Sequence, residues 1–153
     1  MAKNLPSDFT DKILAKDRIS FGDVRRLKRD ILPDGIASRE EAEALLGLDR
    51  AVTKADAAWE RWLVTTVVDF VVWAERPTGI VDEDTALWLA AALRAHAGTR
   101  AGKRGRLIAR EIAEEAHAFE NDALATLAGI GAASPRPRRN REPATEPAFA
   151  AQL

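Results

Sequence analysis

The sequence predicts an all-α protein: a compact bundle of about six helices around a buried central helix, with a long C-terminal helix. First, apolar residues recur at helical spacing between prolines, glycines and helix-capping residues. Second, alanine, arginine and glutamate are abundant, as in helical proteins. Third, residues 59–73 hold three of the four tryptophans, and their apolar residues form no one-sided stripe. Such a pattern is typical of a helix buried nearly all round, which we place at residues 54–75.

Two helices are predicted before the first proline-glycine turn. One covers residues 7–16, with Ser7 as its N-cap. The next begins at Ser20, which resembles a capping box with Asp23. It ends before Pro33, because proline cannot continue a helix.

A third helix and a short connection are predicted before the central helix. Ser38 and Glu41 form a capping box, in which each residue satisfies a backbone N–H of the first turn. We expect this helix to end at about Gly47, with residues 48–53 as the connection.

Another helix follows the central one, after a turn marked by Pro77 and Gly79. Asp82 is its predicted N-cap, and its inner stripe extends to about Ala97. Three glycines then interrupt the pattern: Gly98, Gly102 and Gly105.

The apolar stripe resumes at about Arg106 and keeps helical phase to Ile130, which predicts one long helix kinked near Asn121. Residues 132–153 combine proline and charge with few apolar side chains, so we expect a disordered tail. Residues 1–131 would then form a single domain.

The chain matches itself when Pro33 is aligned with Pro77. The same offset places Gly35, Ile36, Ser38, Ala42 and Leu45 on Gly79, Ile80, Asp82, Ala86 and Leu89. The match has two interpretations. One is a duplicated helical hairpin. The other is that tight connections between helices generally use proline, glycine and a capping residue, so that two unrelated turns look alike.

The segment from Asp34 to Ala42, D-G-x-x-S-x-E-E-A, resembles the TerB-like tellurite-resistance helical domains. Residues 19–97 are also similar to bacterial proteins that carry EAEALL, a Trp-rich helix and a P-x-G-x-V-D-E turn. The resemblance implies an all-α domain linked to stress responses and membrane-linked complexes, sometimes with a divalent metal. Asp34 and Glu41 match the acidic positions of the family's first turn, whereas Thr78 replaces the acid of the second.

A calcium-binding loop is the metal hypothesis at the first turn. If Gly35 is counted as the sixth loop residue, the ligand positions hold Asp30, Asp34, Ser38 and Glu41. Leu32 occupies a position that needs an oxygen ligand, so a helix cap and turn is the other interpretation. We expect no cofactor, with a divalent cation as the alternative.

Basic residues crowd the start of the predicted long helix: Arg100, Lys103, Arg104 and Arg106. Positive side chains at a helix N-terminus oppose its dipole, so an anionic partner would stabilise them. Nucleic acid or anionic lipid would fit. The net charge of −1 favours the alternative of solvated charge balanced by neighbouring acids.

Two further residues depart from the expected patterns. Trp88 lies about 100° around its helix from Leu89, which predicts an exposed interface anchor, or packing under the C-terminal helix. Asp69 stands among valines in the central helix. We therefore expect a buried structural acid whose oxygens accept hydrogen bonds.

No catalytic constellation is present in the sequence. There is no cysteine, and the G-x-S-x-G, H-E-x-x-H and G-x-G-x-x-G patterns are missing. Glu114 and His117 have metal-bundle spacing but no second pair. The N-terminus carries no signal peptide, which predicts a cytoplasmic protein.

These observations predict a non-enzymatic, TerB-like interaction module that binds another macromolecule, most simply a protein. An anion or nucleic-acid binder and a divalent-cation sensor are the alternatives.

Overall fold

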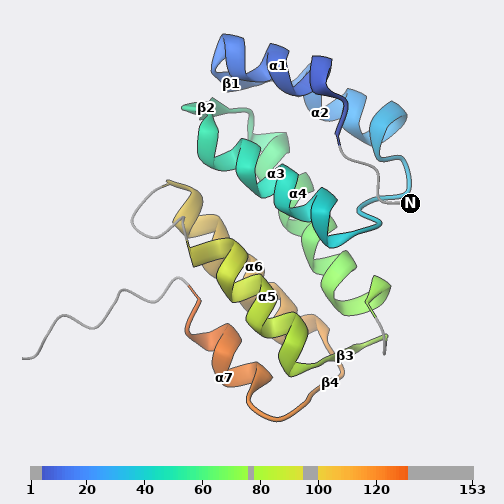
Figure 1. The fold of residues 1–153 in the computed structure, drawn as a ribbon, viewed down its shortest axis with the longest axis vertical. Helices are drawn as coiled ribbons and strands as arrows, with labels where there is room; N and C mark the ends of the chain where they lie inside the picture. The colour runs from blue at the N-terminus through green and yellow to red at the C-terminus, as the bar shows by residue number, and fades with distance from the viewer. Residues whose placement is uncertain (1–4, 76–77, 95–99, 131–153) are drawn as a thin grey trace, which may run out of the picture.

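The computed structural model describes the backbone of residues 5–75, 78–94 and 100–130, and their side chains except those of residues 94 and 100–102. Its α-helices are α1 (Ser7–Lys16), α2 (Phe21–Arg26), α3 (Arg39–Ala51), α4 (Ala57–Asp69), α5 (Glu83–Arg94), α6 (Arg100–Glu115) and α7 (Ala123–Ala128). Two π-helical turns, η1 (Leu27–Ile31) and η2 (Phe70–Ala74), continue α2 and α4. The all-α prediction is confirmed (Figure 1).

Two short parallel strand pairs join distant parts of the chain. β1 (Arg18–Ile19) pairs with β2 (Lys54–Ala55), and β3 (Ile80–Val81) pairs with β4 (Ala118–Phe119). The first pair ties the start of α2 to the start of α4. The second ties the turn before α5 to the segment between α6 and α7.

The central helix is α4 with its π-helical continuation η2. It contacts α2 on one side and α6 on the other, so it connects the N-terminal and C-terminal helices (Figure 1). Its buried side chains are Trp59, Leu63, Val64, Thr66, Val67, Val68, Phe70, Val71 and Val72. The predicted central helix is thus confirmed, but it begins at Ala57 rather than at residue 54, because residues 54–55 form β2, and one narrow face of it is exposed.

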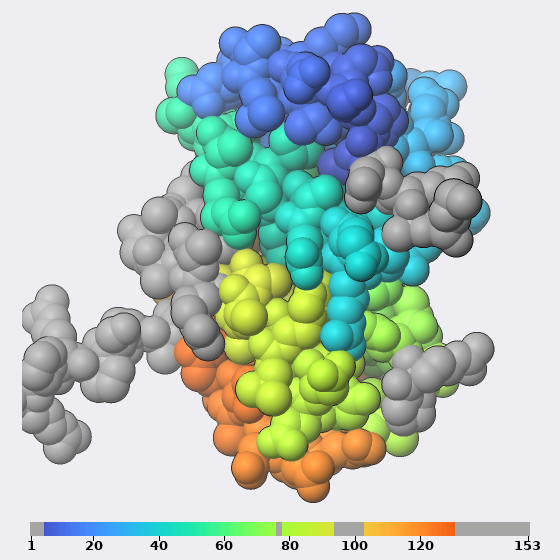
Figure 2. Space-filling model, in the orientation of Figure 1, coloured from blue at the N-terminus to red at the C-terminus, as the bar shows by residue number. Residues whose placement is uncertain are grey.

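Four of the other helices, α1, α3, α5 and α7, lie in a row along one face of the molecule. Figure 2 shows α3 beside α5 on one face of the molecule, with α1 above α3 and α7 below α5. Within the described ranges, none of the helices combines the length and apolar character needed to cross a membrane.

The first two helices have the predicted extents. α1 covers Ser7–Lys16, but its N-cap is Pro6, without a side-chain hydrogen bond, rather than Ser7. The Ser20 capping box is complete. The Ser20 hydroxyl accepts from the backbone N–H of Asp23 at 3.2 Å, and the Asp23 carboxylate accepts from that of Ser20 at 2.8 Å.

The third helix is longer than predicted. Ser38 caps it as expected, whereas the Glu41 carboxylate accepts from the backbone N–H of Ala37 at 2.7 Å. The helix continues past Gly47 to Ala51, so the predicted connection at 48–53 is wrong. A glycine costs a helix only about 1 kcal/mol, and burial of Leu48 in the next turn offsets it.

Replacing Ser38 with alanine should lower the free energy of unfolding by about 1 kcal/mol, because the N–H of Glu41 loses its acceptor. Chemical denaturation of the purified protein measures this change. The matched variant Ser38→Asp keeps an acceptor and should cost much less. Equal losses in the two variants would show that the cap does not stabilise α3.

The C-terminal part differs most from the prediction. Gly102 and Gly105 do not interrupt the helix, because both lie inside α6. A Cβ at Gly105 would stand 3.7 Å from Leu93, an ordinary van der Waals distance, so α6 packs directly on α5 at this position. The predicted glycine break is therefore wrong at both positions, while Gly98 and Ala97 lie outside the described residues.

The predicted long helix at 106–130 is also wrong. α6 ends at Glu115, and Asn121 adopts a left-handed conformation with φ of 47° before α7 begins. The backbone N–H of His117 donates to the carbonyl of Gly79 at 2.7 Å, which draws this segment into strand pairing. The apolar residues of α6 and α7 nevertheless continue one helical spacing, because both helices turn an apolar face to the core. α7 does so by packing back onto α5. The predicted tail, 132–153, lies outside the described residues.

The two halves of the internal match share their backbone geometry. Gly35 and Gly79 have φ of 82° and 79°, values that favour glycine. A π-helical turn precedes each glycine, and a capping side chain follows it: Ser38 before α3 and Asp82 before α5. The repeated sequence therefore corresponds to a repeated turn.

Candidate interaction groove

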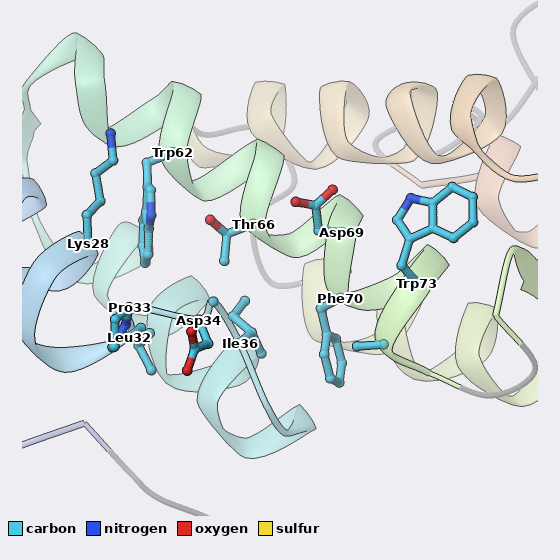
Figure 3. A pocket seen from close by; sticks show the side chains of 12 residues that line it. Lys28, Leu32, Pro33, Asp34, Ile36, Trp62, Thr66, Asp69, Phe70 and Trp73 are labelled. Carbon is cyan, nitrogen blue, oxygen red and sulfur yellow. The ribbon is translucent and has the colours of Figure 1, made fainter.

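A hollow of about 530 Å³ lies between the turn after η1 and the exposed face of α4 and η2 (Figure 3). We call it the Trp62–Trp73 groove. Its lining residues are Lys28, Leu32, Pro33, Asp34, Gly35, Ile36, Trp62, Thr66, Asp69, Phe70, Trp73 and Ala74.

One wall of the groove is a stripe along the central helix. Trp62, Thr66, Asp69 and Trp73 follow one another at spacings of about one helical turn, so they share one face. Figure 3 shows Trp62 beside Lys28 at one end and Trp73 at the other, with the Asp69 carboxylate between the two rings. The turn at residues 33–36 forms the opposite wall.

Both tryptophans of the groove are held by neighbouring side chains. Trp62 is half-buried, and its ring centroid lies 5.8 Å from that of the fully buried Trp59. Trp73 is 38% exposed; its indole N–H donates to the Glu115 carboxylate at 3.3 Å, and its ring meets the edge of His117 at 5.2 Å. Because the rings are already positioned, a ligand that packs on them loses little side-chain entropy of the protein.

Asp69 is exposed to the groove, so its prediction as a buried structural acid is wrong. The valines that flank it in sequence are buried, Val68 and Val72 among them, whereas Asp69 is at the surface. Partial burial of the carboxyl, and then the negative charge of Glu115, raise the pKa of Asp69 above its ordinary value. Among the described residues, no cation pairs with Asp69.

Trp88 is not the free anchor that the sequence predicts. It is half-buried and packs toward α3 rather than under the C-terminal helix: its indole N–H donates to Glu43 at 2.6 Å. The Arg39 guanidinium lies 5.0 Å from its ring centroid, and Phe70 meets it edge-on at 6.0 Å. Trp88 therefore joins α5 to α3 and η2.

The basic residues at the start of α6 do not form one surface. Arg104 is buried, and its guanidinium lies 3.4 Å from the Asp49 carboxylate. Lys103 and Arg106 are exposed, and the side chain of Arg100 is outside the described set. Arg104 is thus unavailable to an anionic partner. The three glycines predicted a break in the chain here, whereas α6 begins at Arg100 and its packing buries Arg104.

The predicted metal ligands already have other partners or stand apart. The Ser38 hydroxyl and the buried Glu41 carboxylate both accept backbone N–H groups of the α3 cap, while Asp30 and Asp34 are exposed. In the part of the chain that the structure describes, no three His, Asp or Glu side chains gather as a metal site would need. His117 lies beyond the end of α6, so it no longer shares a helical face with Glu114.

Trp62 and Trp73 are the groove residues that sequence reasoning did not single out. The signal was present, since Asp69 lies one to two helical turns from each tryptophan on a single face. No protein-family model matches this chain, nor does any curated protein or solved structure.

Proposed function

We propose that this protein is a non-enzymatic helical module that binds a protein partner through the Trp62–Trp73 groove. The partner contributes an extended segment with arginine or lysine side chains. Kinship with TerB-like domains, and a role in a stress-response or membrane-linked complex, belong to the same proposal.

The observation that carries this proposal is the carboxylate of Asp69, which pairs with no cation of the described residues and lies between two positioned tryptophan rings. An arginine or lysine entering the groove would pair with Asp69 and lie against an indole face, where cation–π attraction contributes about 0.5–2 kcal/mol. Tryptophans at the centre of a hollow are also frequent energetic anchors of protein interfaces. The groove thus offers both charge and apolar surface to one side chain.

The selectivity of the groove follows from its charges. Asp34 and Asp69 line it, and Glu115 adjoins Trp73, whereas Lys28 is the one cation among the described lining residues. An anionic ligand would meet repulsion near Trp73. The groove therefore favours a basic protein segment over nucleic acid.

A short arginine-proline peptide should bind the full-length protein and shift the indole N–H signals of Trp62 and Trp73 in nuclear magnetic resonance spectra. The indole signal of the buried Trp59 should stay in place. Asp69→Asn should weaken binding about fivefold, since a partly exposed ion pair contributes about 1 kcal/mol. Asp11→Asn, which removes the same charge from an exposed position on α1, should leave the affinity unchanged. Equal binding of a peptide with glutamate in place of arginine would refute the proposal.

The same titration should depend on pH. The pKa of Asp69 is raised in the free protein, and a bound cation would lower it. Binding therefore favours the ionised carboxylate, and the affinity should fall as the pH drops through the raised pKa. This loss should be absent in Asp69→Asn.

A further inference from the structure

The chain itself contains a segment with the chemistry that the groove selects. Residues 135–141 read PRPRRNR, so two prolines alternate with arginines and four arginines fall within seven residues: Arg136, Arg138, Arg139 and Arg141. Proline rings and guanidinium groups both pack well against indole faces, and arginine pairs with carboxylates in a bidentate way. The residue types of this segment are therefore complementary to the groove: arginine to the carboxylate of Asp69, and proline and arginine to the rings of Trp62 and Trp73.

The groove is within reach of this segment. Ile130, the last described residue, lies beside Gly105 near the start of α6: a methyl carbon of Ile130 stands 3.8 Å from where a Cβ of Gly105 would be. Glu115, at the other end of α6, touches Trp73. Ten helical residues separate the two points, about 15 Å, and one helix diameter adds about 10 Å. Eight extended residues span about 25 Å, so the chain from Ile130 is long enough for Arg138 to reach the groove.

Attachment also favours occupancy. A ligand on a short linker has an effective concentration in the millimolar range, so even contacts that are weak in solution would fill the groove for much of the time. An external partner would then have to displace the attached segment.

We propose that residues 135–141 are an intramolecular ligand of the Trp62–Trp73 groove and limit the access of a basic partner to it. This inference rests on the proposed function, because it assigns a regulator to the same groove. The arginines would compete for the carboxylate of Asp69 and for the face of Trp73.

A spin label tests the contact in the full chain. Because the sequence has no cysteine, Ser134→Cys gives one attachment point for a nitroxide. We expect the label to broaden the indole signals of Trp62 and Trp73 more than that of Trp88, which lies against α3. Replacing Arg136, Arg138, Arg139 and Arg141 with glutamine in the labelled chain should remove most of this broadening.

Two outcomes would overturn the inference. One is equal broadening with and without the four arginines. The other is broadening that appears only between a labelled chain and a separate, isotope-labelled copy, because the segment would then act between molecules.

The peptide titration separates this inference from the proposed function. With the four arginines replaced, the external peptide should bind at least twofold more tightly, because its competitor is lost. If the peptide binds both chains with the same affinity and the label broadens neither groove signal, the groove is a binding site without an intramolecular ligand. If the label broadens the groove signals but the peptide fails to bind, the proposed function fails alone.

Discussion

Replacing Asp49 with alanine should destabilise the protein by about 3–5 kcal/mol, the largest effect that we expect from a single polar side chain. Asp49 is 2% exposed and Arg104 is 5% exposed, and their charged groups lie 3.4 Å apart. The indole N–H of Trp59 donates to the same Asp49 oxygen at 3.0 Å. Without the Asp49 carboxylate, the buried guanidinium would keep only the half-exposed carboxylate of Glu60, 3.8 Å away, as a counter-charge, and the buried N–H of Trp59 would lose its acceptor.

The pair also has incomplete hydrogen bonding, which sharpens the test. One Asp49 oxygen and two Arg104 nitrogens have no hydrogen-bond partner within the described structure. A neutral replacement of both groups should therefore recover much of the loss. Asp49→Asn combined with Arg104→Met keeps an acceptor for Trp59 and should cost less than Asp49→Ala alone. Denaturant unfolding measures the free energy of unfolding of the wild type, of Asp49→Ala and of the double variant. A loss below about 1 kcal/mol for Asp49→Ala would mean that water screens the ion pair.

Gly79→Ala should cost about 2–5 kcal/mol, and Gly35→Ala only about 1–2 kcal/mol. Both glycines have φ near 80°, so the backbone strain of an added Cβ is the same. A Cβ at Gly79 would lie 3.1 Å from His117 and 3.3 Å from Trp73, whereas a Cβ at Gly35 would lie 3.9 Å from its nearest neighbour, Thr66. The difference between the variants measures the crowding alone.

The two glycine variants also distinguish a change in stability from a change in the groove. Gly79→Ala should shift the indole signal of Trp73, because the added methyl group displaces the ring. Gly35→Ala should leave that signal in place. If both variants lose the same stability, His117 and Trp73 move aside freely, and the groove wall is softer than the contacts indicate.

The sequence predicts local features of this fold well where one residue type has one physical role. Ser20, Ser38 and Asp82 cap helices as expected, since each has an oxygen within reach of a free N–H. The break after Glu115 could not be predicted from the apolar stripe. The spacing of apolar residues indicates only which side chains face the core. Because α6 and α7 both face the core, the stripe continues across the break between them.

The candidate groove was harder to predict because it depends on which face of α4 stays uncovered. Asp69 lies among valines in sequence, but the helix turns about 100° per residue, so sequence neighbours point elsewhere. Arg104 shows the reverse error: it was expected at the surface, and it is buried against Asp49 of α3. Trp88 was expected either at the surface or under the C-terminal helix, and it packs against α3. Exposure of these side chains is a property of the tertiary packing.

The parallel strand pairs constrain the order in which this protein can fold. Arg18 pairs with Lys54 and Ile80 with Ala118, so each pair closes a loop of about three dozen residues that contains helices. Closing such a loop costs chain entropy before any contact repays it, whereas a helix forms from neighbouring residues. We therefore expect the helices to form early and the strand pairs late. Because the second pair positions His117 against Trp73, we expect that end of the groove to be completed only in the last stage of folding.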